Sequence, residues 1–283
     1  MDTLRMILMG LVQGLTEFLP VSSSGHVSLA KELLGITLGV REVVVLHVGT
    51  LVGMVHFFRA ELFAFARTLL PIPAAATDGE RTARQRDRKL LFCIAIGTFV
   101  TVVIALTVRP LVDAAMQSLT AVGVGLIGTG LVLRFVFGGS GGRDVESESR
   151  RDLHGVSPIH AATIGVAQSL ALFPGISRAG ITIAAGTLLG YRQSEAARFS
   201  FLLSFPTIAG AAILVSFEDG ADVAAAAGAV GMGPLLIGAA AAAISGWLAL
   251  HTLFALFRRT TLAGFSYYCF GVGLLAVAFD RLG

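Results

Sequence analysis

Charged residues are scarce in this chain, and their scarcity excludes most classes of soluble protein. Of its 283 residues only 14% are charged and 55% are hydrophobic, whereas a typical soluble domain has roughly 25% charged residues. The mean hydropathy is +0.81. A chain so poor in charge is solvated by lipid rather than by water, so we predict an integral membrane protein with several spans.

Cysteine is also rare, and its placement excludes one class of site. The two cysteines, Cys93 and Cys269, both lie inside apolar runs. This placement argues against a disulfide and excludes a metal cluster held by cysteines. We also expect no cleavable signal peptide, because the first apolar stretch runs directly into Glu17 without a small-residue cleavage pattern.

Six uncharged runs approach the ~20 residues that a spanning helix needs. In chain order they are Val43–Phe58, Leu90–Val108, Ala114–Leu133, Phe199–Phe217, Gly233–Leu256 and Thr260–Phe279. Charged loops separate these runs, and the largest predicted loop is Arg59–Lys89. The sequence therefore predicts an all-α integral membrane fold with six transmembrane helices.

Two further apolar stretches are too interrupted to be simple spans. Met6–Leu29 contains Pro20-Val-Ser-Ser-Ser-Gly-His26, and Pro158–Tyr191 contains Pro174-Gly-Ile-Ser-Arg-Ala-Gly180. Proline and glycine break helices, and the backbone groups that they release are stable at membrane depth only where protein or water satisfies them. Such a pair indicates a buried site, so we predict two re-entrant helical hairpins.

The two broken stretches also resemble each other at a constant offset of 155 residues. The identical pairs are Gly10/Gly165, Gln13/Gln168, Leu15/Leu170, Phe18/Phe173, Ser22/Ser177 and Gly25/Gly180. Each stretch is followed by three candidate spans, and an odd number of crossings turns the second half upside down. We predict an inverted-topology repeat in a single membrane domain, 1–283, with repeat one at 1–137, a linker at 138–157 and repeat two at 158–283.

Basic residues are unevenly distributed over the loops of this topology. Of the 21 lysines and arginines, 15 fall on one side, five fall on the other, and Arg178 lies in the second broken stretch. The excess assigns the first side to the cytoplasm. Both termini then face outward, and the first hairpin enters the membrane from outside.

Glu17 is the first candidate for chemistry. It is the only acid between Asp2 and Glu32, in a stretch otherwise suited to lipid. An ionisable group there is costly and functional by default, although a solvated, idle carboxylate at a hairpin mouth is the alternative. Gln13 lies four residues earlier on the same helical face. Its amide could hold a water or phosphate oxygen, or form only a structural hydrogen bond between helices.

Hydroxyl groups and an imidazole follow directly, at Ser22, Ser23, Ser24 and His26. A hydroxyl nucleophile needs a base, and an imidazole with a pKa of about 6.5 suits that role. Capping of the next helix explains one serine equally well, but it does not explain three serines and a histidine.

Arg178 is the only arginine or lysine of the second broken stretch, and small residues such as Gly175 and Ser177 surround it. A guanidinium pairs with phosphate oxygens, and nearby glycines let backbone N–H groups approach an anion. A snorkelling arginine is the alternative, but snorkelling is expected near helix ends rather than in a Pro-Gly turn. Thr182 either adds a hydroxyl or only packs. Four other histidines are interpreted as satisfied polar contacts: His47, His56, His160 and His251.

Two motifs together carry a family resemblance. Gln13-Gly-Leu-Thr-Glu-Phe-Leu-Pro-Val-Ser-Ser-Ser-Gly-His26 and Phe173-Pro-Gly-Ile-Ser-Arg-Ala-Gly-Ile-Thr182 resemble the bacterial undecaprenyl-diphosphatase family, which is also known for bacitracin resistance. The resemblance covers the whole chain in length, order of spans and placement of motifs. It implies hydrolysis of undecaprenyl diphosphate to undecaprenyl phosphate and inorganic phosphate, which recycles the lipid carrier for peptidoglycan. It also implies the bacterial inner membrane, with the active site facing the periplasm.

The resemblance implies roles for individual residues. Glu17, Ser23, His26 and Arg178 fall on the family's catalytic positions, and a divalent cation, Mg²⁺ or Ca²⁺, is expected to be held partly by Glu17. The remaining motif residues are candidates for substrate binding: Gln13, Ser22, Ser24, Gly175, Ser177 and Thr182. The sequence departs from the family at three positions, since Gln13 replaces a common Glu, His47 a common Gln and Ala179 a common Ser. A site with two carboxylates therefore cannot be assumed.

The expected mechanism places the diphosphate on Arg178 and on backbone N–H groups, with Mg²⁺ bridging its oxygens. Ser23 attacks the terminal phosphorus or orients a water, and His26 moves the proton. The main rival is a transporter or lipid flippase, which would move substrate without releasing phosphate. A third alternative, a scaffold without catalytic activity, gives no function to Glu17, His26 and Arg178. Expected partners are a polyprenyl diphosphate and membrane lipids but no nucleic acid, and a homodimer stays open.

Overall fold

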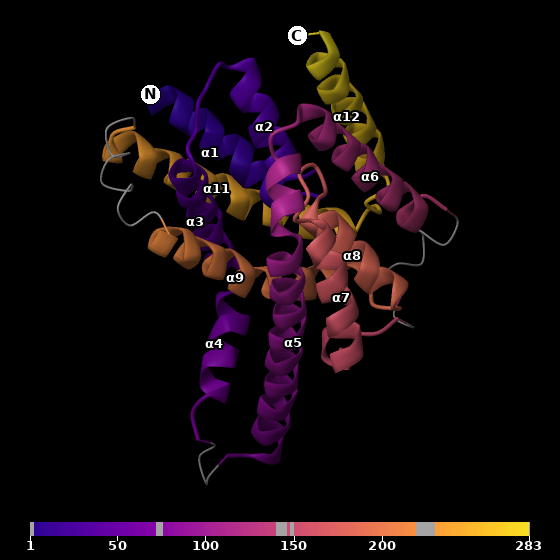
Figure 1. Cartoon of the computed structure of the whole chain (residues 1–283). Helices are drawn as coiled ribbons and strands as arrows, with labels where there is room; N and C mark the ends of the chain where they lie inside the picture. Colours follow the sequence, from indigo (N-terminus) through magenta and orange to yellow (C-terminus); the bar gives the residue numbers. More distant parts are fainter. Residues whose placement is uncertain (1–2, 72–75, 140–145, 148–149, 219–229, 283) are drawn as a thin grey trace.

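We describe a computed structural model of the chain over residues 3–71, 76–139, 146–147, 150–218 and 230–282, without the side chains of 215–218. Helices make up almost all of this part, and its only β contact is an isolated bridge between Arg151 and Tyr191. The predicted linker, 138–157, lies partly outside the described residues. The chain is therefore all-helical over these ranges, as predicted (Figure 1).

The helices follow one another along the whole chain. They are α1 (Thr3–Phe18), α2 (Ser23–Leu33), α3 (Val40–Phe57), α4 (Arg59–Thr68), α5 (Asp78–Ala115), α6 (Leu119–Phe137), the 3₁₀ turn η2 (Leu153–Gly155), α7 (Pro158–Leu170), α8 (Arg178–Leu188), α9 (Gln193–Glu218), α11 (Met232–Phe257) and α12 (Gly264–Leu282).

Six of these helices, α3, α5, α6, α9, α11 and α12, are long and apolar enough to cross a membrane. Each contains most of one predicted uncharged run, so the six predicted spans are confirmed as helices. Large apolar side chains are exposed on their outer faces, for example Phe99, Phe135 and Leu275. Such side chains suit a lipid solvent, and the protein is a multi-pass membrane protein.

The prediction of a loop at Arg59–Lys89 was wrong for most of its length. Its first part forms α4, and its last part is the start of α5, a helix of 38 residues. That helix is about 57 Å long at the usual rise per residue, which exceeds the ~30 Å hydrocarbon core. Thr77 and Glu80 form a capping box at its start, so the charged residues begin a helix that leaves the membrane rather than a coil.

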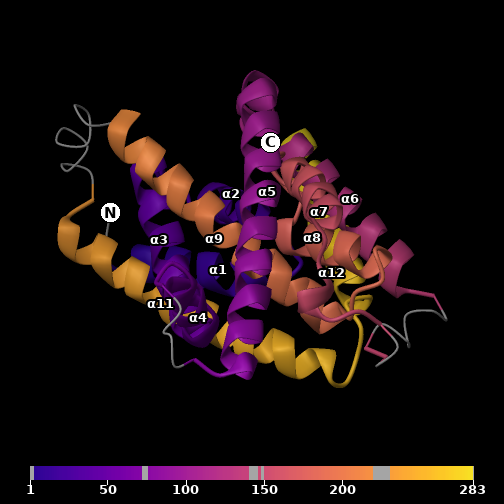
Figure 2. The same cartoon turned by 90° about the horizontal axis from the view of Figure 1, so that it is seen from below.

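Each of the two broken stretches forms a pair of helices joined by a short turn, namely α1–α2 and α7–α8 (Figure 1). The breaks coincide with the predicted Pro20 and Pro174. In the first turn Ser22 adopts a positive φ of 68°, and in the second Gly175 adopts 83°. The helices of each pair pack together, and α1 also packs along α11 while α7 packs along α5 (Figure 2).

Candidate active site

The two turns meet inside the molecule although about 155 positions separate them in sequence. The Gly175 N–H donates to the Ser24 hydroxyl oxygen at 3.4 Å. Beside this contact, the Arg178 guanidinium donates to Glu17 Oε1 at 2.5 Å. The structure thus places the carboxylate predicted from the first stretch and the guanidinium predicted from the second in direct contact.

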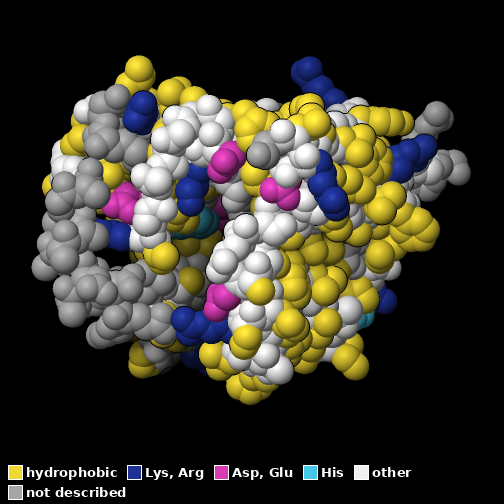
Figure 3. Space-filling model, turned by 45° about the horizontal axis from the view of Figure 1, so that its top comes forward, with side chains coloured by type: hydrophobic (Ala, Val, Ile, Leu, Met, Phe, Trp, Pro, Cys, Tyr) yellow, Lys and Arg dark blue, Asp and Glu magenta, His cyan; other side chains and the backbone are white. Residues whose placement is uncertain are grey.

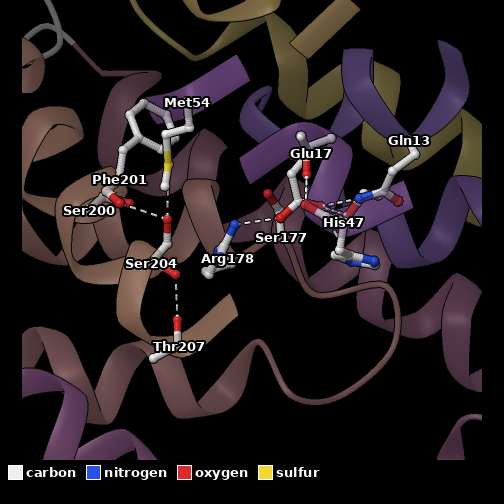
Figure 4. A network of polar contacts seen from close by, with 12 residues as sticks. Gln13, Glu17, His47, Met54, Ser177, Arg178, Ser200, Phe201, Ser204 and Thr207 are labelled. Atoms are coloured by element: carbon white, nitrogen blue, oxygen red, sulfur yellow. Dashed lines mark hydrogen bonds and ion pairs between the residues drawn. The ribbon is translucent and has the colours of Figure 1, made fainter. Parts of the chain in front are cut away.

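Glu17 is the centre of the cluster, and 8% of its surface is exposed. Its second oxygen, Oε2, accepts from Gln13 Nε2 at 2.8 Å and from the Ser23 hydroxyl at 2.5 Å. Figure 4 shows Arg178 pointing toward this carboxylate from α8, with Gln13 and His47 on its other side. One buried carboxylate therefore organises side chains from α1, α2, α3 and α8.

Two helix N-termini lie beside this carboxylate. Ser22 caps α2 by accepting from Gly25 N–H at 3.4 Å, and Ser177 caps α8 by accepting from Gly180 N–H at 3.1 Å. The next residue in each helix, Ser23 or Arg178, is the one that contacts Glu17. The positive ends of two helix dipoles converge here, and such ends favour a bound anion such as phosphate.

Thr129 of α6 holds the second turn in place. Its hydroxyl oxygen accepts from the Ser177 N–H at 2.9 Å and lies 3.1 Å from the carbonyl oxygens of Gly125 and Gly175. A side chain on Gly175 would collide with the Val122 carbonyl, which explains the glycine there. Sequence reasoning missed Thr129, because a threonine in an apolar helix usually bonds only within its own helix.

The hydrogen bonds of His26 go to residues other than Ser23. Its Nδ1–H donates to the Ser22 carbonyl at 2.8 Å, and its Nε2 lies 2.7 Å from the Tyr268 hydroxyl of α12. The two rings stack at 5.5 Å. The nearest acceptor for the Ser23 proton is therefore Glu17, and the predicted proton transfer between Ser23 and His26 would need the imidazole to move.

His47 is the histidine that the structure brings to the site. Its Nδ1–H donates to the Val43 carbonyl at 2.8 Å, which is the polar contact expected from the sequence. Its other nitrogen, Nε2, lies 3.7 Å from Glu17 Oε2. Only a weak signal for this second role is present in the sequence, namely that His47 stands where the resembling family commonly has glutamine.

Two other predictions concern hydroxyl and imidazole groups away from Glu17. The Thr182 hydroxyl donates to the Arg178 carbonyl at 2.6 Å and lies 2.5 Å from the Ser200 hydroxyl of α9. Thr182 therefore links the first turn of α8 to α9. His160 lies 2.6 Å from the Tyr191 hydroxyl, so its interpretation as a satisfied polar contact is confirmed.

The oxygen atoms around Glu17 are too few to coordinate a hard cation unless substrate supplies further ligands. Within the described residues no group of three or more His, Cys, Asp or Glu could hold a metal ion. The oxygen donors beside the carboxylate are the Gln13 amide and the Ser23 hydroxyl. Magnesium commonly binds one or two carboxylates and completes its sphere with substrate phosphates and water, so this sparse set is compatible with Mg²⁺ or Ca²⁺.

The face that carries both ends of the chain in Figure 1 is hollowed. Figure 3 shows a histidine side chain inside this hollow and charged side chains around its rim. Since exposed yellow side chains cover much of the surrounding surface, the hollow lies among faces suited to lipid. A ligand with a polar head and an apolar tail would match these surroundings.

Residues 6–275 match the family described as "Bacitracin resistance protein BacA". The chain is also similar to curated proteins of full length. An undecaprenyl-diphosphatase of Rubrobacter xylanophilus is 38% identical over 285 residues, which cover 98% of each chain. An undecaprenyl-diphosphatase of Methanosphaera stadtmanae is 33% identical over 282 residues, again covering 98% of each. "Undecaprenyl-diphosphatase 2" of Stutzerimonas stutzeri is 36% identical and covers 95% of this chain and 94% of its own.

Proposed function

Since this chain belongs to the bacitracin resistance protein BacA family, we propose that it hydrolyses undecaprenyl diphosphate to undecaprenyl phosphate and inorganic phosphate. The observation that carries the proposal is the contact of Glu17 with both Ser23 and Arg178 between two helix N-termini. This arrangement offers a nucleophile, a proton acceptor and an anion site within a few ångströms. Hydrolysis returns the lipid carrier to cell-wall synthesis.

Arg178 and the two helix N-termini bind the diphosphate. One of five guanidinium N–H donors contacts Glu17, and the others, which have no partner among the described residues, remain for phosphate oxygens. Ser22, Ser24, Gly175 and Ser177 shape the two turns around this anion. Charge neutralisation of this kind supplies most of the catalysis in phosphoryl transfer.

The Ser23 hydroxyl oxygen attacks the terminal phosphorus, and its proton passes to Glu17, whose Oε2 is 2.5 Å away. The anhydride P–O bond breaks, undecaprenyl phosphate leaves, and the phosphoryl group stays on Ser23. A water then attacks this phosphoserine, Glu17 returns its proton to the serine oxygen, and inorganic phosphate leaves with the water oxygen and one of its protons. The other proton of the water is released to solvent, so Ser23 and Glu17 are both restored. His26 orients the start of α2 through its bond to the Ser22 carbonyl.

A divalent cation, when bound, neutralises the charge on the diphosphate. Glu17 and Gln13 would hold it through side-chain oxygens, and Glu17 would share its carboxylate between the cation, Arg178 and Ser23. The chain's own residues still bind the phosphate and accept the serine proton.

We further propose that the chain is an inverted repeat, with α1–α2 and α7–α8 as re-entrant hairpins. Equivalent close contacts support this. A Cβ atom added to Gly238 of α11 would lie 2.9 Å from the Met6 carbonyl oxygen. Likewise, a Cβ atom added to Gly97 of α5 would lie 3.0 Å from the Ala161 carbonyl oxygen. Met6 and Ala161 are separated by the same offset of 155. Between the halves, Gly123 of α6 and Gly273 of α12 face each other reciprocally.

The same repeat supports an orientation. The 15 basic residues of the arginine-rich side would lie in the cytoplasm, and the hollow beside both termini would face the periplasm. The protein then acts in the bacterial inner membrane as a single membrane domain, with repeats at 1–137 and 158–283.

Phosphate release by purified protein in detergent tests the function. The wild-type chain should release inorganic phosphate from a polyprenyl diphosphate, and Arg178→Ala should lower the rate by ~10²–10³-fold, as expected for loss of a charge-stabilising donor. Arg178→Lys keeps the charge but loses the paired donors, so it should retain a fraction of the rate. Transport of labelled substrate without phosphate release would instead support the flippase.

The nucleophile has its own test. With substrate labelled in the terminal phosphate, acid quenching during turnover should trap label on the protein, and Ser23→Ala should abolish the trapping. Label-free protein from an active wild-type enzyme would show that water attacks directly and that Ser23 only orients it.

A further inference from the structure

A group of cavities lies away from the active site, around Arg198. Three cavities of about 450, 470 and 700 Å³ all include this arginine among their lining residues. The first is formed by the ends of α3 and α11 and the starts of α4 and α9. Its residues play no part in the proposed hydrolysis.

Phenylalanine side chains separate this cavity from the active site. Phe18, which follows Glu17, packs edge-on against Phe201 at 5.6 Å. Phe201 in turn lies 6.2 Å from Phe254, which lines the cavity. The cavity is therefore on the opposite side of an aromatic layer from the catalytic carboxylate, at the arginine-rich end of the spans.

The cavity is rich in hydrogen-bond donors. Its lining includes the guanidinium groups of Arg59 and Arg198, whereas Trp247 contributes its indole face, since Trp247 Nε1 is itself buried. Arg198 Nη1 donates to the Glu61 carboxylate at 2.7 Å, and Arg59 Nη1 donates to the His56 backbone carbonyl at 2.8 Å. In each of these two hydrogen bonds the guanidinium uses one of its five N–H donors. Glu61 is the only carboxylate of the lining, against two arginines. A ligand for this cavity must supply acceptor oxygens and negative charge.

The walls of the same cavity are aromatic. Phe57 and Phe254 stack at 5.3 Å, and the imidazole of His251 lies 4.2 Å from the indole of Trp247. His251 Nδ1–H donates to the Trp247 carbonyl at 2.9 Å, which fixes the ring. Aromatic walls beside arginines at the end of a membrane span suit a lipid head group whose tail leaves along the helices.

We propose that this cavity is a second ligand site, which binds the phosphate of a lipid head group through Arg198 and Arg59, beside the indole of Trp247. The ligand is a lipid phosphate, supplied either by a membrane phospholipid or by a polyprenyl phosphate; only the latter source rests on the proposed function. The site lies across the aromatic layer from the active site, so both can be occupied at once.

Trp247 makes the proposal testable, because it is the only tryptophan of the chain. The full chain carrying Arg178→Ala is titrated in detergent with a polyprenyl monophosphate, with phosphatidylglycerol and with inorganic phosphate, while tryptophan emission is recorded. This background weakens binding at the active site and slows turnover. At least one of the two lipids should change the emission saturably.

Substitutions in the same background identify the site. Arg198→Gln and Arg59→Gln should each weaken the apparent affinity for the lipid by about tenfold, as expected for loss of one charged hydrogen-bond donor. Arg109→Gln, at the far end of α5, removes the same charge from an exposed position and should leave the titration unchanged. Phosphate release by Arg198→Gln with Arg178 intact shows that this variant folds.

A response to both lipids would identify a general phospholipid site, and a response to the polyprenyl phosphate alone would identify a product site. No saturable change with either lipid, a response to inorganic phosphate alone, or equal titrations for Arg198→Gln and Arg109→Gln would overturn the proposal. Phosphate release by the wild-type chain is measured separately, so a failure here leaves the proposed hydrolysis standing.

Discussion

The turn between α1 and α2 and the turn between α7 and α8 are built with the same devices. Ser22 and Ser177 cap the second helix of each pair, and Gly25 and Gly180 donate the capping N–H. The residue after the cap differs, because it is a serine in one turn and Arg178 in the other. Both side chains reach the same carboxylate, so equivalent positions supply the nucleophile and the anion-binding group.

The glutamines at equivalent positions diverge in the same way. Gln13 donates to Glu17, whereas Gln168 donates to Thr101 of α5 at 3.0 Å. Leu172 stands at the position that corresponds to Glu17. Apart from Gln13, the residues shared by the two halves therefore build turns and helix contacts, and the residues that differ carry the proposed chemistry.

Loss of the carboxylate should have the largest effect. Glu17→Gln should lower the rate of phosphate release by ~10²–10⁴-fold, because the serine loses its proton acceptor. It also leaves the mostly buried Arg178 without its partner, so the thermal unfolding midpoint should fall. Glu61→Gln removes the carboxylate of the other interhelical Arg–Glu pair and should retain most of the activity. Equal losses in the two variants would contradict the assignment.

Thr129 and Thr101 offer a sharper comparison. Thr129→Val leaves the buried Ser177 N–H without an acceptor, at a cost of ~1–3 kcal/mol, and lets the turn before Arg178 shift. We expect kcat to fall by ~10–100-fold, since small misplacements near the reacting atoms are costly. Thr101→Val should destabilise the protein similarly, because it loses contacts to Gly165 and Gln168, but should keep kcat. Activity losses that merely follow stability in both variants would remove Thr129 from the site.

The glutamine pair should show a smaller difference. Gln13→Ala removes one hydrogen bond to Glu17 and should lower kcat/KM about fivefold, which corresponds to about 1 kcal/mol. Gln168→Ala should change the unfolding midpoint without changing kcat/KM. Steady-state kinetics and thermal melts of both variants test this, and a matching kinetic loss for Gln168→Ala would show that the halves are not divided in function.

The capping serines should give the smallest effects. Ser22→Ala and Ser177→Ala should each destabilise the protein by ~1 kcal/mol. Ser22→Gly should be less harmful than Ser22→Ala, because Ser22 has a positive φ of 68° that glycine adopts without strain. At Ser177, with φ of −75°, this advantage of glycine should shrink. Identical glycine-to-alanine differences at the two caps would argue against strain at Ser22.

The spans, the two broken stretches and the cluster of Glu17, Ser23 and Arg178 could be predicted from the sequence. An ionisable side chain in an apolar stretch has few physical roles, so its presence is informative. His26 shows where such reasoning ends, since its ring direction is set by Tyr268, 242 residues away. The roles of Thr129 and His47 likewise depend on which helices cross, which local patterns do not encode.

The error at Arg59–Lys89 has a different cause. Charge indicates contact with water, but it does not indicate coil, and α4 with the first turns of α5 are charged helices. The Thr77–Glu80 capping box was a usable signal for the start of α5. At the C-terminal end of α4, Arg88 of α5 donates to the Thr68 carbonyl at 3.1 Å, a tertiary contact that no local pattern predicts.

The ion pair between Arg178 and Glu17 gives the idle enzyme a self-cancelling charge. Without substrate, the cation and the anion neutralise each other in a largely buried part of the protein. An incoming diphosphate binds the remaining guanidinium donors and brings negative charge next to the carboxylate, so it weakens the contact between Arg178 and the proton acceptor. Binding of the anion therefore also prepares Glu17 to accept the serine proton.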